Sequence, residues 1–139
     1  MMRKLDNRGV ASFEFILVFV SLFMLIFAIF DLGRYAITMQ SLRTLASAGA
    51  RAIMINCYTP NLTQSPPQSP SSCTTDYLST ADKQNAAPFL YRGGLTPTLT
   101  VASSGNNLTV TASQAGFTML MPIWGTTLNA PSASTQIPF

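Results

Sequence analysis

The chain of 139 residues has no histidine and only eight basic and five acidic side chains. Charged residues make up 9% of it, whereas about a quarter is usual in a globular protein. Without histidine the commonest general base and metal ligand is missing, and two cysteines alone are a poor metal site. A glycine-rich phosphate loop is also absent from the sequence. These absences argue against an enzyme, and the sequence implies no catalytic residue, metal or cofactor.

What the sequence does contain is a long apolar segment near its start. The run from Val10 to Phe30 is interrupted by neither proline nor glycine. As a helix rising about 1.5 Å per residue, it is long enough for a hydrocarbon core of about 30 Å. A secretory signal has a shorter core of about 7–15 residues and a small-residue cleavage site, and the chain lacks such a site after Phe30. Residues 10–30 are therefore predicted to form a transmembrane helix.

Basic residues precede this segment and predict its orientation. Arg3, Lys4 and Arg8 lie within the first nine residues. Lysine and arginine beside a first span remain on the cytoplasmic side, so the rest of the chain is expected outside. The sequence pI of about 9.2 therefore reflects membrane topology, and we expect no nucleic-acid partner.

Glu14 stands inside the start of the apolar segment, five residues after Gly9. An ionisable group in hydrocarbon is costly, so such a residue is expected to have a function and a partner. Cleavage between Gly9 and Val10 would create that partner, because the new ammonium group of Val10 could reach the Glu14 of an adjacent subunit. The alternative is that Glu14 only extends to the lipid headgroups.

The helix is predicted to continue beyond the membrane as an amphipathic extension over residues 31–55. No proline occurs there, and small or apolar residues recur at steps of three and four. This stripe is a candidate helix assembly face. The alternative is packing on the chain's own core, but the residues that follow are too few to cover so long a helix, which favours packing between subunits. The members of the stripe are Leu32, Tyr35, Met39, Leu42, Ala46, Gly49 and Ile53. Asp31 and Arg34 are expected to form an exposed pair at the outer membrane boundary.

The composition changes after Ile55, and Pro60 is expected to end the helix. Residues 56–94 are predicted to be a loop region closed by a Cys57–Cys73 disulfide, since both cysteines would lie outside the membrane. A redox pair is the alternative, but the two residues are not closely spaced. A short helix within residues 76–92 would be limited by a proline at position 88.

Residues 95–139 are predicted to form a small β-rich domain. Apolar and polar residues alternate in 95–101 and 108–112, with a turn-rich connection between them, which predicts a hairpin. The apolar stretch 117–125 could be an edge strand, a loop covering the helix or a surface for a neighbour. A last strand is expected within 132–137. The predicted fold class is α+β, a long helix packed against a small antiparallel sheet.

Three elements of the sequence together resemble the TadE-like family of minor pilins, or pseudopilins. They are Arg8-Gly9-Val-Ala-Ser-Phe-Glu14-Phe15 before the apolar run, Phe30-Asp31-Leu-Gly33-Arg34 after it, and Ala-Ser-Ala-Gly49-Ala-Arg51. The resemblance implies a tight-adherence (Tad, Flp or type IVb) pilus, with processing after Gly9 by a prepilin peptidase. It implies a bacterial inner-membrane protein with a periplasmic domain, reaching the cell surface if assembled. The implied partners are other pilins, the inner-membrane platform of the pilus machine and the lipid bilayer.

The major pilins of that system are much shorter than this chain, so a minor subunit is the better match. The expected function is therefore structural, in pilus biogenesis and adherence. The alternative is a single-span, membrane-anchored binding module that is exported but does not enter a filament. Residues 1–9 would be a cytoplasmic leader in the first reading and would remain attached in the second.

Overall fold

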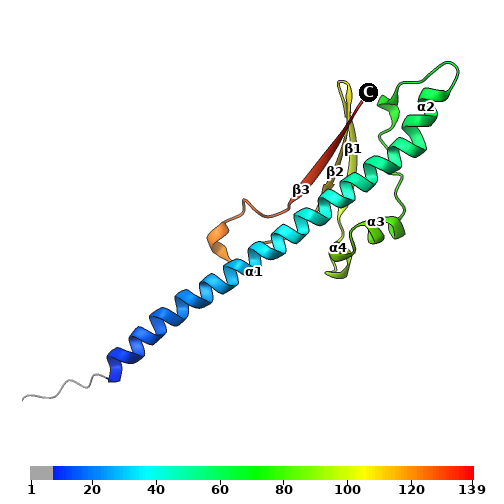
Figure 1. The fold of residues 1–139 in the computed structure, drawn as a ribbon. Coiled ribbons are helices and arrows are strands. Elements are labelled where there is room, and N and C mark those ends of the chain that lie inside the picture. The colour runs from blue at the N-terminus through cyan, green and yellow to red at the C-terminus, as the bar shows by residue number, and fades with distance from the viewer. Residues whose placement is uncertain (1–7) are drawn as a thin grey trace, which may run out of the picture.

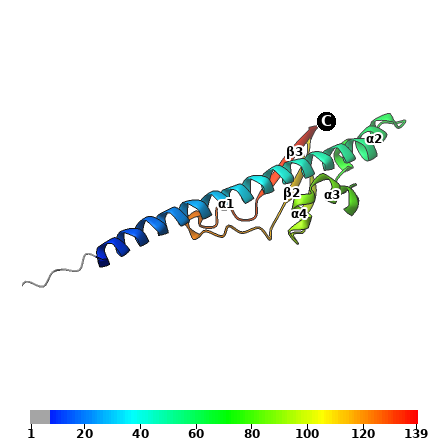
Figure 2. The ribbon, with the colours of Figure 1, turned by 60° about the horizontal axis from the view of Figure 1, so that its bottom comes forward.

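A computed structural model describes residues 8–139; the predicted leader residues Arg3 and Lys4 lie outside the described part. One long helix, α1 (Arg8–Ile53), carries a three-stranded antiparallel sheet along its C-terminal half (Figure 1). In the turned view of Figure 2, the N-terminal half of α1 still extends away from the rest of the chain. The α+β fold predicted from the sequence is confirmed.

The helix does not end before Pro60, and this part of the prediction is wrong. After α1 the chain forms a π-helical turn, η1 (Met54–Tyr58), and then α2 (Thr59–Thr63). The backbone N–H of Thr59 donates to the carbonyl of Met54, five residues back. This wider turn shifts the hydrogen-bond register, and Pro60 falls in the first turn of α2, where its missing N–H needs no partner.

The sheet consists of β1 (Thr98–Ser104), β2 (Asn107–Ser113) and β3 (Ser132–Pro138), in that order. The predicted hairpin and last strand are thus present, although β1 continues closer to the turn than expected. Ser104 pairs with Asn107 across a two-residue turn. Gly105 in that turn has a φ of 58°, a value that side-chain-bearing residues rarely adopt.

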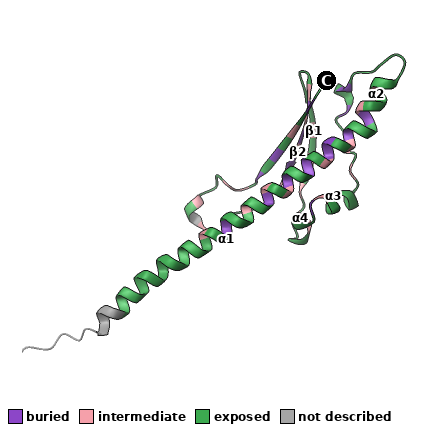
Figure 3. Cartoon of the chain, viewed as in Figure 1, coloured by how far each residue is buried: buried purple, intermediate pink, exposed green. Residues whose placement is uncertain are grey.

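The core lies between α1 and the sheet (Figure 3). Alternate residues of β2 point toward the helix, as the period of two requires. The buried side chains that form this layer include Leu42, Leu45, Ala46, Ile53, Leu90, Leu108, Val110, Ala112 and Ile137. The N-terminal half of α1 contributes nothing to it.

The region between helix and sheet contains η2 (Pro70–Ser72) and two short helices, α3 (Thr80–Ala86) and α4 (Pro88–Arg92). Ser79 caps α3: its hydroxyl accepts from the Asp82 N–H at 3.2 Å and donates to the Asp82 carboxylate at 2.6 Å. The proline that limits α3 begins α4.

The predicted disulfide is present: Cys57 and Cys73 are bonded, with their Cα atoms 5.8 Å apart. It ties η1 to the segment after η2 and is buried against the core.

Near α3, Lys83 and Asp76 form an ion pair. The pKa of the neighbouring Tyr91 hydroxyl is raised above its usual value, mainly because the hydroxyl is partly buried. The positive charge of Lys83 opposes this rise, and the negative charge of Asp76 adds to it.

Candidate functional site

The N-terminal half of α1 is apolar and uncovered. Its described side chains from residue 12 to residue 30 are exposed except for a half-buried Ala28. Phe15, Phe19, Phe23 and Phe27 form a row on one side, with neighbouring ring centroids 5.5, 4.3 and 6.1 Å apart. A core helix of a soluble protein would be mostly buried, whereas only 6% of the most apolar window of this helix is.

Within the described residues, this is the one helix long and apolar enough to cross a membrane. Length and composition alone would also fit an N-terminal export signal. The helix therefore indicates membrane anchoring or export, and its orientation stays a prediction.

Glu14 lies on this exposed helix, and no hydrogen bond or ion pair joins it to another described side chain. Ser21 differs, because its hydroxyl donates to the carbonyl oxygens of Leu17 and Val18 at 2.7 and 3.2 Å. A serine satisfied by its own helix costs little in lipid. Glu14 is thus the ionisable group of this apolar half of α1, and its carboxylate has no hydrogen-bond or ion-pair partner among the described side chains. Gly9 and Val10 belong to the first turns of α1, and their side-chain surroundings are not described.

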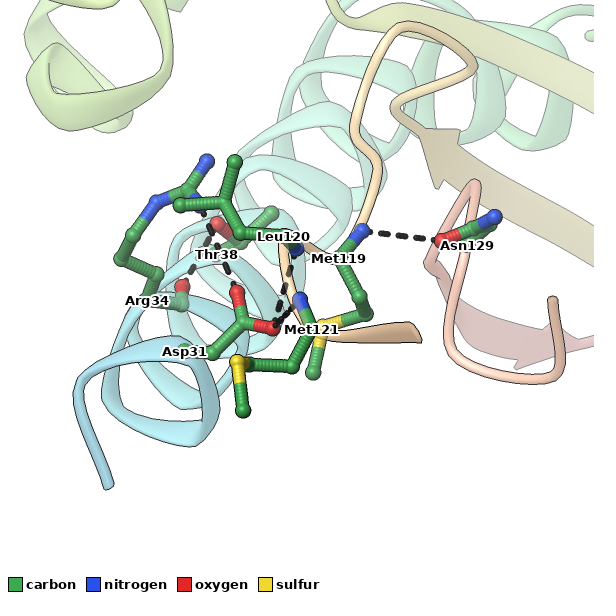
Figure 4. A network of polar contacts seen from close by, with 7 residues as sticks. All are labelled: Asp31, Arg34, Thr38, Met119, Leu120, Met121 and Asn129. Atoms are coloured by element: carbon green, nitrogen blue, oxygen red, sulfur yellow. Dashed lines mark hydrogen bonds and ion pairs between the residues drawn. The ribbon is translucent and has the colours of Figure 1, made fainter. Parts of the chain in front are cut away.

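Asp31 marks the junction between the bare helix and the sheet domain (Figure 4). Its carboxylate is 1% exposed. One oxygen, Oδ2, accepts the backbone N–H groups of Leu120 and Met121, each at 3.0 Å, and Oδ1 faces the Arg34 guanidinium at 3.4 Å. The predicted pairing of Asp31 with Arg34 is confirmed. The predicted exposure is wrong for Asp31, because the loop formed by residues 117–125 covers its carboxylate.

Arg34 and its neighbours extend this junction toward the sheet. The guanidinium carbon of Arg34 lies 5.3 Å from the centroid of the Phe117 ring. Phe117 also packs near Tyr35, with ring centroids 6.2 Å apart. Thr38 is buried, and its hydroxyl donates a hydrogen bond to the Arg34 carbonyl oxygen at 2.8 Å. Of the three alternatives for residues 117–125, the loop that covers the helix is the one observed.

The amphipathic stripe faces the chain's own sheet over most of its length. Leu42, Ala46 and Ile53 are fully buried. Gly49 is buried too, and a Cβ built there would lie 2.8 Å from Leu99 Cδ2. The stripe becomes accessible toward the N-terminal half of α1, where Tyr35 and Met39 are half-buried and Leu32 is 40% exposed. Any contact with another subunit through this stripe is therefore limited to its N-terminal end.

Gly33 contrasts with Gly49. A Cβ built at Gly33 would meet no atom within 4 Å. An exposed helical glycine costs roughly 0.5–1 kcal/mol relative to alanine. Nothing in the described chain requires a glycine at this place, and sequence patterns could not distinguish it from Gly49.

Among the described residues, no group of three or more histidine, cysteine, aspartate or glutamate side chains is placed to hold a metal ion. The site that remains is a surface rather than a pocket for chemistry. It consists of the exposed apolar half of α1, the carboxylate of Glu14, and the enclosed polar junction around Asp31 at the C-terminal end of that half.

Fold and site together define a protein class: a single apolar N-terminal helix that carries a small α+β domain on its distal half. Residues 9–51 match the family model described as TadE-like protein. The chain thus carries a TadE-like segment, and the resemblance seen in its sequence is confirmed over that segment. Proteins of this pilin-like family are typically structural rather than enzymatic. No curated protein and no solved structure matches the chain.

Proposed function

We propose that this protein is a structural minor pilin of a Tad pilus. It is cleaved after Gly9, held in the inner membrane by residues 10–30 with its domain in the periplasm, and assembled with other pilins through α1. The observation that carries this proposal is the bare apolar half of α1 with an unpartnered Glu14, within the segment that matches TadE-like proteins.

The energetics support assembly through this half of the helix. Glu14 alone in hydrocarbon is unfavourable, whereas a neighbour's Val10 ammonium would neutralise it and define the axial register between subunits. The rest of the domain covers α1 only from Asp31 onward, so the preceding helix is free to pack against other helices once it leaves the lipid. Cleavage would be done by a prepilin peptidase, and assembly would take place on the inner-membrane platform.

A second candidate is the anchored binding module, an exported domain that stays on its single span. The exposed domain surface is compatible with it. It requires no cleavage after Gly9, and it assigns no partner to Glu14.

Replacing Glu14 by glutamine distinguishes the minor pilin from the anchored binding module. A neutral amide is easier to place in lipid than an unpaired carboxylate, so membrane insertion should be kept or improved. Cleavage after Gly9 should also be kept, since it takes place on the cytoplasmic side. Recovery in sheared pili, or cross-linking to partner pilins, should fall strongly, and Glu14→Asp should lie between the two.

Ser21→Ala provides the matched control, because it removes a polar group of the same span that is already satisfied within the helix. It should assemble as the unaltered protein does. If Glu14→Gln enters pili and supports adherence at the unaltered level, subunit pairing is wrong and the anchored module is the better function.

A further inference from the structure

The loop 117–125 presents apolar side chains outward. Leu120 is 73% exposed, more than any other large apolar side chain described, and Ile123 is 60% exposed. Trp124 lies beside them in the short helix η3 (Pro122–Trp124). Large apolar side chains that point to solvent in a small domain with so little charge call for something to cover them.

The position of this loop along α1 is fixed by Asp31. The backbone N–H groups of Leu120 and Met121 bind its carboxylate directly (Figure 4). The apolar run ends one residue earlier, at Phe30, which is itself 69% exposed. One residue of helix corresponds to about 1.5 Å, so the exposed loop lies at the level where the predicted span ends.

The charges near the loop also fit a membrane surface. The Asp31 carboxylate is enclosed, so it presents no negative charge outward. A hollow of about 460 Å³ opens beside the loop; Arg34 and Arg92 line it together with Phe89 and Leu95. Arginines above an apolar layer match the phosphates that lie above the acyl chains of a bilayer.

We propose that the loop 117–125 is a membrane foot: Leu120 and Ile123 enter the lipid interface next to the end of the span, with Trp124 at headgroup depth. This inference rests on the proposed membrane anchor. A bilayer is preferred over a second subunit because Asp31 holds Leu120 at the level where the exposed apolar helix ends, at Phe30. Trp124 is half-buried with its indole Nε1 enclosed by the domain, so it marks the level of the loop and leaves the lipid contact to Leu120 and Ile123. The foot would hold the domain at a fixed angle to the membrane before assembly.

Trp124 is the only tryptophan in the chain, so the unaltered protein reports the depth of its own loop. We would reconstitute the full chain in phosphatidylcholine–phosphatidylglycerol vesicles with acyl chains brominated either near the headgroup or near the methyl end. Trp124 emission should be lost mainly with the shallow bromines. A fluorophore on Leu25→Cys should be quenched mainly by the deep bromines, because that residue lies within the span.

The double variant Leu120→Ser/Ile123→Ser should restore much of the Trp124 emission. The matched control is Ile55→Ser/Leu62→Ser, which alters exposed apolar side chains at the far end of the helix and should leave quenching unchanged. A quenched Leu25 label with unquenched Trp124 would overturn the foot and leave the anchor intact. Trp124 shielding that depends on protein density rather than on bromine would assign the loop to a second subunit, which also overturns the proposal. An unquenched Leu25 label would overturn the anchor and the foot together.

Discussion

At the scale of single residues, Asp31 decides where the sheet domain meets the helix. It is a carboxylate buried by a loop about ninety residues away in the chain, and its acceptor oxygens are filled by two backbone N–H groups and one guanidinium. Buried charges persist in proteins when they are paired and hydrogen-bonded in this way. Asp31 therefore acts as a clamp for loop 117–125 rather than as an exposed boundary charge.

Replacing Asp31 by alanine should release this clamp. The N–H groups of Leu120 and Met121 would lose their acceptor, and we expect the free energy of unfolding to fall by roughly 2–4 kcal/mol. Urea unfolding of the detergent-solubilised full chain, followed by Trp124 emission, measures the loss. Asp31→Asn keeps one acceptor oxygen and should lose less. Equal losses for both variants would mean that the charge, and not the acceptor, holds the loop.

At the scale of elements, α1 is one helix with two environments. Its second half lies against the sheet, and at Gly49 the sheet is so near that an added Cβ would lie 2.8 Å from Leu99 Cδ2. Its first half has no such cover. Gly33 and Gly49 both lie in the second half, but Gly33 meets open space whereas Gly49 is packed against the sheet.

Alanine substitutions at these two glycines should act in opposite directions. Gly33→Ala should stabilise the helix by about 0.5–1 kcal/mol, because it meets open space. Gly49→Ala should destabilise the domain by about 1 kcal/mol net, since the new Cβ would lie 3.1 Å from the stiff Val110 side chain. Thermal unfolding of the purified chain tests both. If the Gly33→Ala protein is stable but cross-links poorly to pilins, a neighbouring subunit lies against Gly33. If it is destabilised, the conclusion that a Cβ at Gly33 meets no other atom is wrong.

The disulfide links the end of the long helix to the segment before α3. It closes a loop of about 17 residues, for which chain entropy predicts a contribution of about 3 kcal/mol. The double variant Cys57→Ser/Cys73→Ser should lose at most that much, measured by urea unfolding against the unaltered chain under non-reducing conditions. Alkylation of native protein supplies the control. Two freely reacting thiols would show that the bond does not form in the cell.

At the scale of the whole molecule, the proposed cleavage after Gly9 changes both the net charge of the protein and its N-terminus. Removing residues 1–9 takes away Arg3, Lys4, Arg8 and Asp6. The remaining charge is nearly balanced, so orientation must be established before the cut. The basic leader would direct insertion and then be discarded.

The mature protein is therefore expected to begin at Val10. Intact-mass measurement or N-terminal sequencing of membrane-extracted protein tests this, and a Gly9 substitution that blocks the peptidase is the control. A mature chain that keeps Met1, or one that begins near Gly33, would contradict the pilin assignment.

Local patterns in the sequence were enough to predict the long helix, the hairpin, the last strand and the disulfide. Each of these depends on residues a few positions apart, or on the only two cysteines present. A period near 3.6 or 2 identifies the element whatever it packs against. The TadE-like segment was recognisable for the same reason, since its residues all lie on one helix.

Only the tertiary structure decided which side of each element is covered. The sequence could not show that loop 117–125 reaches Asp31, or that the stripe through Leu42 and Ile53 faces the chain's own sheet. It also suggested a helix end before Pro60, where a π turn instead carries the helix on. Periodicity specifies which residues share a face, but the partner of that face is selected by packing among segments far apart in the chain. That selection buried the carboxylate of Asp31 and left the one of Glu14 exposed.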